Sequence, residues 1–326
     1  MIWSLLTEGR AEKQFSIINK KEEESMINRF KSLRFCFLAF ALLTLVVYLS
    51  AQDFEKIQIQ TVKIKDSVFM LVGGGGNIGV SVGKDGILLV DSQFAELVEK
   101  IKAAITKIRD GSIRYLINTH FHYDHTNGNE PLGKAGAFII AHDNVRKRMK
   151  DQWSHWAFDT KIPPYPEIAL PVITYTDSMT IYFNDEEIHA IYMGNAHTDG
   201  DTVVYFRKAN VIHMGDVYFN GGYPFIDVPH GGSVNGIIEV LSRVLGKIDK
   251  DTKVIPGHGP LSNREELEGY RDMLVTIRDK ILRLIKEGKT LEEVIASKPT
   301  AEFDKTHQLM MPKDLFVRIL YEDLSR

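Results

Sequence analysis

The feature that most constrains this chain is a dense group of metal-binding side chains at residues 119–125, which read Thr-His-Phe-His-Tyr-Asp-His. It holds three imidazoles and one carboxylate, at His120, His122, Asp124 and His125. Imidazole and carboxylate are the usual ligands of zinc outside thiolate sites. The apolar run just before it, residues 113–117, predicts a short buried strand. The group therefore lies where a strand ends and a loop begins, the usual place for a site in an α/β sheet.

The spacing of these residues allows two metals. His120 and His122 project to the same side of an extended backbone and can hold one ion. Asp124 and His125 diverge from that pair and can serve a second ion. Further candidates lie at the edges of β-like runs, next to glycines that let the backbone turn: His197, Asp216 and His258. Any one of them alone is more often an ordinary loop residue, but the whole set suits two metals with a solvent position left open.

This pattern resembles the signature of the metallo-β-lactamase superfamily, His-x-His-x-Asp-His, which stands here at residues 120–125. The resemblance runs from about Val62 to about Asn263. It includes Asp91, after the apolar run at residues 88–90, which in that family supports the site from behind the ligands. It implies an α/β fold of a particular type, a four-layer αβ/βα sandwich with the metal site at one edge between the two sheets.

The resemblance also implies two Zn²⁺ ions and how the ligands divide between them. It implies that the first zinc is held by three histidines, His120, His122 and His197. The second zinc is held by Asp124, His125 and His258, and the carboxylate of Asp216 bridges the two ions. Iron or manganese also suits such nitrogen and oxygen ligands.

Two departures from the best-known zinc β-lactamases bear on the activity. Those enzymes have Cys at the position of Asp216 and, three residues later, a Lys that pairs with the carboxylate of the drug; here that position holds Phe219. We therefore expect a dinuclear zinc hydrolase that attacks a carbonyl substrate of the β-lactam, lactone or thioester type with a metal-bound hydroxide, and at most weak β-lactamase activity. The alternatives are a lactonase or glyoxalase II-like thioesterase without β-lactamase activity, and a non-enzymatic metal-binding protein.

Other residues are candidates for catalysis, for binding the substrate or for orienting a ligand. Asp124 is expected to orient the attacking water. Asn220 and Tyr223, in the loop after Asp216, are candidates for binding a carbonyl or stabilising an oxyanion, with packing as the alternative for Tyr223. His230 is a candidate for the pocket wall. Asp201 is a candidate for orienting a ligand, as carboxylates often do for metal-bound histidine.

The first 52 residues differ from the rest. A basic stretch at residues 26–34, an uncharged apolar run at 35–49 and small residues at Ser50 and Ala51 predict a secretory signal, with Met26 as an alternative start. The run is short for a membrane span. We therefore expect an exported protein, periplasmic or secreted, that contacts a membrane only if this leader stays uncleaved as an anchor. Residues 53–326 are expected to form a single metallo-β-lactamase-like domain with a helical tail.

The composition limits the kinds of molecule that this protein is expected to bind. The net charge of −3 argues against nucleic acid, which needs a basic face. A small-molecule substrate is expected, and the sequence carries no signal for the oligomeric state. The only cysteine, Cys36, lies in the leader, so no disulfide is expected in the mature chain.

The hydrophobic pattern also predicts elements around the site. Strand pairs are expected at 57–62 with 68–72 and at 77–82 with 86–90, and helices at 94–108, 142–150, 264–286, 291–296 and 313–324. The run Gly73–Gly76 predicts a flexible turn. Residues 151–177 show the least pattern and predict either a lid or a cluster of packed aromatic side chains. His142 is expected to cap a helix, and His213 to be structural.

Overall fold

The structure, a computed structural model, describes residues 54–155, 160–307 and 311–326. Lys56–Arg326 forms one compact unit. The predicted leader, residues 1–52, lies outside the described residues. Within the described part of the chain, none of the helices combines the length and the apolar character that crossing a membrane requires.

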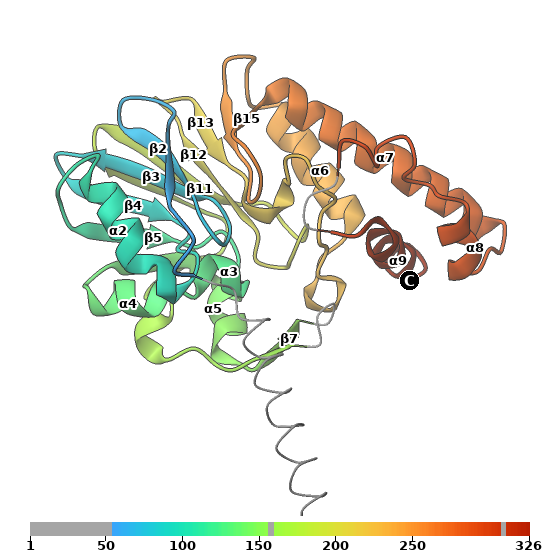
Figure 1. Cartoon of the computed structure of the whole chain (residues 1–326), viewed down its shortest axis with the longest axis horizontal. Coiled ribbons are helices and arrows are strands. Elements are labelled where there is room, and N and C mark those ends of the chain that lie inside the picture. The colour runs from blue at the N-terminus through green and yellow to red at the C-terminus, as the bar shows by residue number, and fades with distance from the viewer. Residues whose placement is uncertain (1–53, 156–159, 308–310) are drawn as a thin grey trace, which may run out of the picture. The chain divides into compact units, whose positions relative to one another are not determined.

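Seven strands form the first sheet, in the order β1-β2-β3-β4-β5-β6-β9 (Figure 1). The strands β1 to β4 follow one another as antiparallel neighbours, and β4, β5, β6 and β9 are parallel. Their bounds are β1 Gln60–Lys63, β2 Val68–Val72, β3 Ile78–Gly83, β4 Gly86–Val90, β5 Ile113–Ile117, β6 Phe138–His142 and β9 Ile173–Tyr175. Both expected strand pairs are therefore present.

Six strands form the second sheet, in the order β10-β11-β12-β13-β14-β15. All neighbours are antiparallel except β13 and β14. Their bounds are β10 Ser178–Phe183, β11 Glu186–Tyr192, β12 Thr202–Phe206, β13 Val211–His213, β14 Lys253–Ile255 and β15 Ser262–Asn263. A separate hairpin joins β7 (Trp153–His155) to β8 (Thr160–Ile162).

The two sheets pack face to face because their strands alternate apolar residues between two buried faces. On β12, Val204 and Phe206 point into the core between the sheets, where Leu88 and Val90 of β4 meet them. Val203 and Tyr205, on either side of Val204 in sequence, point instead to the helices behind the second sheet. Each sheet thus needs a helical cover on its outer face.

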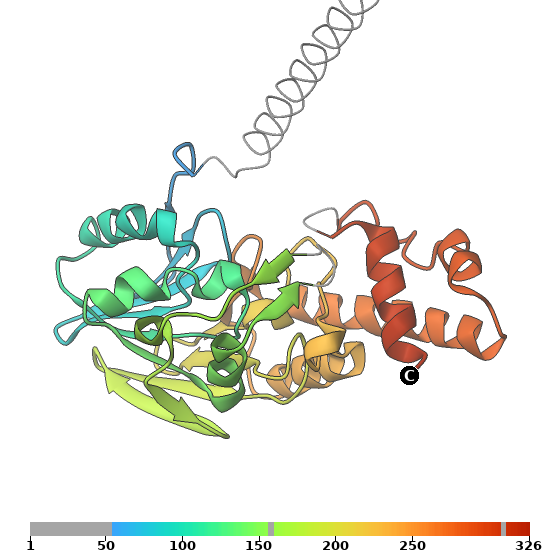
Figure 2. The ribbon, with the colours of Figure 1, turned by 90° about the horizontal axis from the view of Figure 1, so that it is seen from below.

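Helices supply both covers, which gives four layers (Figures 1 and 2). Beside the first sheet lie α2 (Val98–Thr106), α4 (Asn129–Lys134) and α5 (Asp143–Lys150). Beside the second lie α6 (Val234–Leu245) and α7 (Arg264–Lys286), and α7 also carries α8 (Leu291–Ala296) and α9 (Lys313–Leu324). The predicted αβ/βα sandwich is confirmed.

The three C-terminal helices begin and end at the residues that the sequence predicts, because their ends are defined by local signals. The side chain of Asn263 accepts a hydrogen bond from the amide of Glu266 at the start of α7. Thr290 and Glu293 form a capping box at the start of α8. His142 likewise caps α5, as expected, by accepting a hydrogen bond from the amide of Asn144.

Two predictions of local structure need correction. The helix expected at 94–108 is divided into a 3₁₀ turn, η1 (Ala95–Leu97), and α2. The segment 151–177, expected to be irregular, contributes β9 to the edge of the first sheet. Strands of three residues are too short to show an alternating pattern, so β9 left no trace in the sequence.

Replacing Phe316 by Ala tests whether α9 belongs to the core. The ring of Phe316 is fully buried and stacks on Tyr223 with 4.8 Å between centroids. We expect the free energy of unfolding to fall by about 3–5 kcal/mol, because the mutation leaves a cavity. Urea denaturation followed by circular dichroism measures this. Phe138→Ala is the matched control, because that ring is 53% exposed and its loss is expected to cost less than about 1 kcal/mol. A similarly small loss for Phe316→Ala would exclude α9 from the core.

Candidate metal centre

The seven predicted ligands come together because several strands end at the same edge of the sandwich. His120 and His122 follow β5, and Asp124 and His125 lie on the short helix α3 (Tyr123–Thr126) that comes next. The remaining three follow β11, β13 and β14 in the second sheet: His197, Asp216 and His258. The site thus lies where loops from both sheets meet.

The ligand atoms form two groups. In each group they lie within 4.8 Å of one another: His120, His122, His197 and Asp216 in one, and Asp124, His125 and His258 in the other. Asp216 also reaches the second group, since its Oδ1 lies 3.0 Å from Nε2 of His125 and its Oδ2 lies 3.5 Å from Nε2 of His258. The atoms fall into the same two sets that the resemblance implied, with Asp216 within reach of both.

Four of the five histidines have one ring nitrogen held by a partner behind the site. Two partners are carboxylates: Asp227 lies 2.8 Å from His122, and Asp91 lies 2.8 Å from His125. The backbone oxygen of Phe225 lies 2.7 Å from His197, and the hydroxyl of Thr119 lies 3.0 Å from His120. Such partners set the tautomer and leave the other nitrogen to coordinate a metal. Those other nitrogens face inward.

These inward atoms fit a divalent cation. Nε2 of His197 lies 2.8 Å from Nδ1 of His122. Nε2 of His120 is buried and has no hydrogen-bond partner among the described residues, and its nearest recorded carboxylate oxygen, on Asp216, is 3.8 Å away. A buried polar atom without a partner is costly. Coordination of a cation would satisfy it, and nitrogen and oxygen donors suit zinc, iron or manganese.

Asp91 fits the supporting role that the resemblance implied for it. Its carboxylate is fully buried and accepts hydrogen bonds from the amide and the hydroxyl of Thr119, at 2.8 and 2.7 Å. The same carboxylate holds His125. The backbone of Asp91 lies in the left-handed region, with φ of 67°, a conformation that costs energy in a non-glycine residue and occurs often at functional sites.

Two histidines of the first group, His197 and His120, have pKa values that favour the neutral ring before any metal binds. Burial lowers the pKa of His197 to about 4. Burial, together with the nearby His125, lowers the pKa of His120 well below its usual value. Neutral imidazole is the form that coordinates a metal.

The second group behaves in the opposite way. Burial opposes protonation of His258, but the carboxylates of Asp216 and Asp124 outweigh it and raise the pKa of His258 to about 9. The same balance between burial and carboxylates raises the pKa of His125 well above its usual value. These two imidazoles therefore carry protons at neutral pH in protein prepared without metal.

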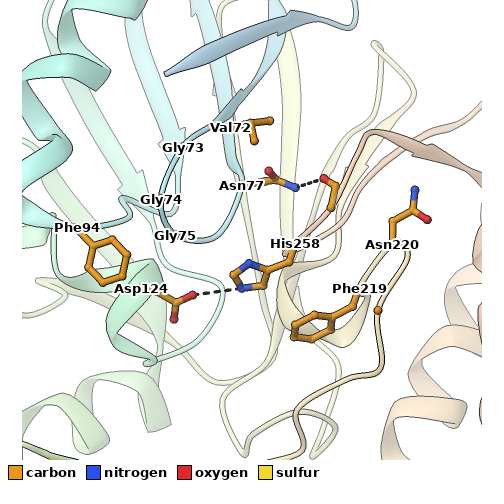
Figure 3. A pocket seen from close by; sticks show the side chains of 12 residues that line it. Val72, Gly73, Gly74, Gly75, Asn77, Phe94, Asp124, Phe219, Asn220 and His258 are labelled. Atoms are coloured by element: carbon orange, nitrogen blue, oxygen red, sulfur yellow. Dashed lines mark hydrogen bonds and ion pairs between the residues drawn. The ribbon is translucent and has the colours of Figure 1, made fainter. Parts of the chain in front are cut away.

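A pocket of about 480 Å³ opens beside the second group (Figure 3). Asp124 and His258 lie at its base, 3.2 Å apart between Oδ2 and Nε2. Phe94 and Phe219 lie on opposite sides of this pair, and the run Gly73–Gly75 forms part of the wall. The side chain of Asp124 is 30% exposed, so this carboxylate can meet a bound molecule.

The glycine run has a more specific role than the flexible turn predicted for it. A Cβ on Gly75 would lie 2.5 Å from the backbone oxygen of Asp124, and one on Gly76 would lie 2.1 Å from the ring of His125. The amide of Gly76 also donates to the oxygen of Asp124. Glycine is needed here because the backbone passes directly against the ligand loop.

The structure does not support the two catalytic candidates of the loop after Asp216. Tyr223 is buried, and its hydroxyl lies 3.3 Å from the oxygen of Thr300 and 2.9 Å from Asp304, in the C-terminal segment. Asn220 lines the pocket, but its amide donates to the oxygen of Pro260 and points away from Asp124 and His258 (Figure 3). Sequence spacing placed both residues near the metals without indicating which way they face.

Asp227 is a functional residue that sequence reasoning missed. It lies 105 positions from His122 in sequence, yet its Oδ2 is 2.8 Å from Nε2 of that ligand. His230, expected in the pocket wall, instead pairs with Asp227 at 2.8 Å. Trp153 stacks on the other side of His122, with 5.3 Å between centroids. Trp156 and Phe158, from the same predicted aromatic segment, lie outside the described residues.

Two further predictions on individual residues can be compared with the structure. Asp201 supports His197 through the backbone, because its Oδ2 accepts the amides of His197 and Thr198 at 2.5 and 2.8 Å. His213 is structural as expected: it is buried, with Nε2 3.0 Å from the oxygen of Asn77 and Nδ1 accepting the amide of Gly215.

The sequence profile of the Metallo-beta-lactamase superfamily matches residues 71–275, which contain every candidate ligand. The chain belongs to the metallo-β-lactamase superfamily. Two solved structures are similar to this metallo-β-lactamase fold. One is a metallo-beta-lactamase from Pontibacter korlensis, with a TM-score of 0.55 and 17% identity, covering 67% of this chain and 99% of that one. The other is the stereoselective inverting sec-alkylsulfatase from Pseudomonas sp., with a TM-score of 0.61 and 17% identity, covering 81% and 50%. At such identity they show the fold alone.

Sequence relatives of this superfamily member include hydrolases. A hydroxyacylglutathione hydrolase of Polaromonas sp. is 26% identical over 163 residues, 49% of this chain and 54% of that enzyme. A hydroxyacylglutathione hydrolase of Pelagibacter ubique is 27% identical over 48% of this chain and 57% of that enzyme. The chain therefore spans little more than half the length of these two. A probable metallo-hydrolase of Methanocaldococcus jannaschii is 26% identical over 59% of this chain and 91% of that protein.

Asp227→Asn is expected to weaken metal binding in the first group. The amide lacks the negative charge and has one acceptor oxygen in place of two, so it holds the rings of His122 and His230 less firmly. Zinc affinity, measured by competition with a chromogenic chelator, should fall about 10–100-fold. Asp185→Asn is the control, because that carboxylate lies exposed in the turn between β10 and β11. Equal affinity in the two variants would contradict the role assigned to Asp227.

Zinc uptake by protein prepared without metal is expected to release roughly one to two protons at pH 7.5, since His258 and His125 then hold protons that the metal must displace. Affinity should therefore rise as the pH increases toward about 9. The raised pKa of His258 also stabilises the fold without metal, and this contribution changes with pH in the opposite direction. It is fully present below about pH 6.5, the pKa of histidine in the unfolded chain, and is lost as the pH rises through about 9. Calorimetry in buffers of different ionisation enthalpy measures the protons, and heats independent of buffer would refute the prediction.

Proposed function

We propose that this chain is an exported dinuclear zinc hydrolase whose substrate is a small molecule with a reactive carbonyl group. One observation carries the proposal: two groups of metal-ligating atoms lie next to each other, and the second group lines a pocket through Asp124 and His258. A structural metal site is closed, whereas a catalytic one keeps a position for water and substrate.

The residues divide the work as follows. The histidines and Asp216 would hold the ions, which supply Lewis acidity and lower the pKa of water. Asp124 would join His125 and His258 as a ligand, and because it also reaches the pocket, it can orient the attacking water. Asp91 and Asp227 hold His125 and His122 in the tautomers that coordinate metal.

The bond attacked is an ester, lactone or thioester in preference to a β-lactam amide. The hydroxyacylglutathione hydrolases among the relatives support thioester or ester chemistry. Phe219 stands where the best-known zinc β-lactamases carry the Lys that pairs with the drug, and it stacks on His258 with 5.2 Å between centroids. Any β-lactamase activity would therefore be weak.

A non-enzymatic metal-binding protein is the competing proposal. The open pocket and the complete ligand set favour an enzyme, because a binding protein has no need for a solvent-facing carboxylate beside its metals. Export, to the periplasm or outside the cell, rests on the leader pattern of residues 1–52. Retention of that leader as an anchor would add the only membrane contact we propose.

Metal analysis beside hydrolysis assays tests the proposal. We expect two zinc ions per chain and turnover of a lactone or a thioester, with a chromogenic cephalosporin the poorest of the three substrates. His122→Ala should lower turnover at least about 100-fold, because it removes a ligand. His189→Ala, at a partly exposed position on β11, serves as the control. Two zinc ions without turnover of any substrate would favour the binding protein, and a chain that takes up no metal would refute both proposals.

A further inference from the structure

We propose that the substrate is uncharged near its carbonyl group and carries an apolar acyl chain that lies between Phe94 and Phe219. This inference rests on the proposed hydrolase function and adds the substrate class to it. Water would add to the carbonyl carbon, the C–O or C–S bond would break, and the leaving oxygen or sulfur would take a proton. The products are a carboxylic acid and an alcohol or thiol, and no further reactant is required.

The charges around the pocket carry the first step of the argument. Among the described residues that line it, the ionisable ones are Asp124 and His258, and both belong to the candidate metal centre. No Lys or Arg lines the pocket in the described part of the chain. The side-chain amide of Asn220, which lines the pocket, donates a hydrogen bond to the carboxylate of Glu266 at 3.5 Å, so this polar lining residue also has a negative neighbour.

Apart from the metal ions themselves, which would face the scissile carbonyl group, an anionic group farther along the acyl chain would therefore enter this pocket without a cationic partner. Placing a charge in a partly dry pocket is costly unless a charged or hydrogen-bonding partner compensates. The pocket thus selects against substrates with a carboxylate near the scissile bond.

The apolar side chains carry the second step. Phe94, Phe219 and Val72 line the same pocket, and the glycine run between Val72 and Asn77 adds no side chain that would narrow it. Figure 3 shows Phe94 and Phe219 on opposite sides of Asp124 and His258, with the pocket between them. Phe219 is held in place by stacking on His258 at an interplanar angle of 17°. A volume of about 480 Å³ accommodates a short acyl chain beside the reacting group.

Matched esters test this selectivity. The 4-nitrophenyl ester of pentanoic acid and the 4-nitrophenyl monoester of glutaric acid have acyl chains of equal length and differ in one terminal carboxylate. With the zinc-loaded chain we expect kcat/KM to be at least about 30-fold higher for the pentanoate, because the pocket offers the carboxylate no partner. A ratio below about threefold, or a preference for the glutarate, would overturn the substrate inference and leave the hydrolase proposal standing.

Variants of the two phenylalanines locate the effect. Phe219→Lys should reduce the ratio at least about tenfold, because it supplies the missing cation. Phe138→Lys, at an exposed position on β6, should leave the ratio unchanged. Phe94→Ala should lower kcat/KM for the pentanoate about tenfold and that for the acetate ester less than about twofold, since only the longer chain reaches the ring. The acetate comparison keeps the test decisive if Phe219→Lys fails to fold.

Binding without turnover separates this inference from the proposed function. Pentanohydroxamic acid and the monohydroxamic acid of glutaric acid both chelate zinc and differ only in the terminal carboxylate. Calorimetry with the zinc-loaded chain should show at least about tenfold tighter binding of the neutral compound. This preference without ester hydrolysis would refute the hydrolase proposal alone. Equal binding of the two compounds would refute the pocket selectivity, whatever the enzyme hydrolyses.

Discussion

The candidate metal centre depends on one buried carboxylate at the end of β4. Asp91 receives the amide and the hydroxyl of Thr119 and the ring of His125. It thereby holds both the first residue of the ligand loop and one of the ligands. Its left-handed backbone turns the carboxylate to face them, and the core between the sheets, which buries the neighbouring Val90, offsets the strain. The same arrangement recurs at His122 and His197, whose partners come from the segment around Asp227. Because protein groups orient these rings from behind, the centre is positioned by the fold before a metal arrives.

The two ligand groups differ in charge for a physical reason, and that difference makes their metal binding respond differently to pH. His197 and His120 lie among other imidazoles, so burial prevails and keeps them neutral. His125 and His258 lie beside Asp216 and Asp124, so the carboxylates prevail over burial. The second group is also the one that meets the pocket. Because a metal must displace these protons to bind, the group that faces the pocket is also the group whose metal affinity depends more strongly on pH.

The sequence indicates which candidate ligands gather at one place in the fold, because their signals are local. The spacing within residues 120–125 and the glycines beside the later ligands need no knowledge of the fold, and the same holds for the caps that define α7 and α8. Asp227 could not be found this way, because its role exists only after loops 105 residues apart meet. The orientation of Tyr223 was equally out of reach, since no periodic pattern describes the path of that loop. The glycine run at residues 73–76 shows most clearly what the sequence alone leaves out. Its composition predicts a flexible turn, whereas in the structure the lack of side chains lets the backbone pass close to His125.

Tyr223 also connects the pocket to the part of the chain that the family profile does not match. The profile ends at residue 275, but the ring of Tyr223 stacks on Phe316 of α9 and its hydroxyl meets Thr300 and Asp304. Four positions earlier in the same loop lies Phe219, which lines the pocket. The C-terminal helices thus hold the loop that bears one of the aromatic walls. The matched core contains the candidate metal ligands, and the segment beyond it supports one wall of the pocket beside them. A substitution at Phe316 of α9 can therefore alter the shape of the pocket while the candidate ligands remain unchanged.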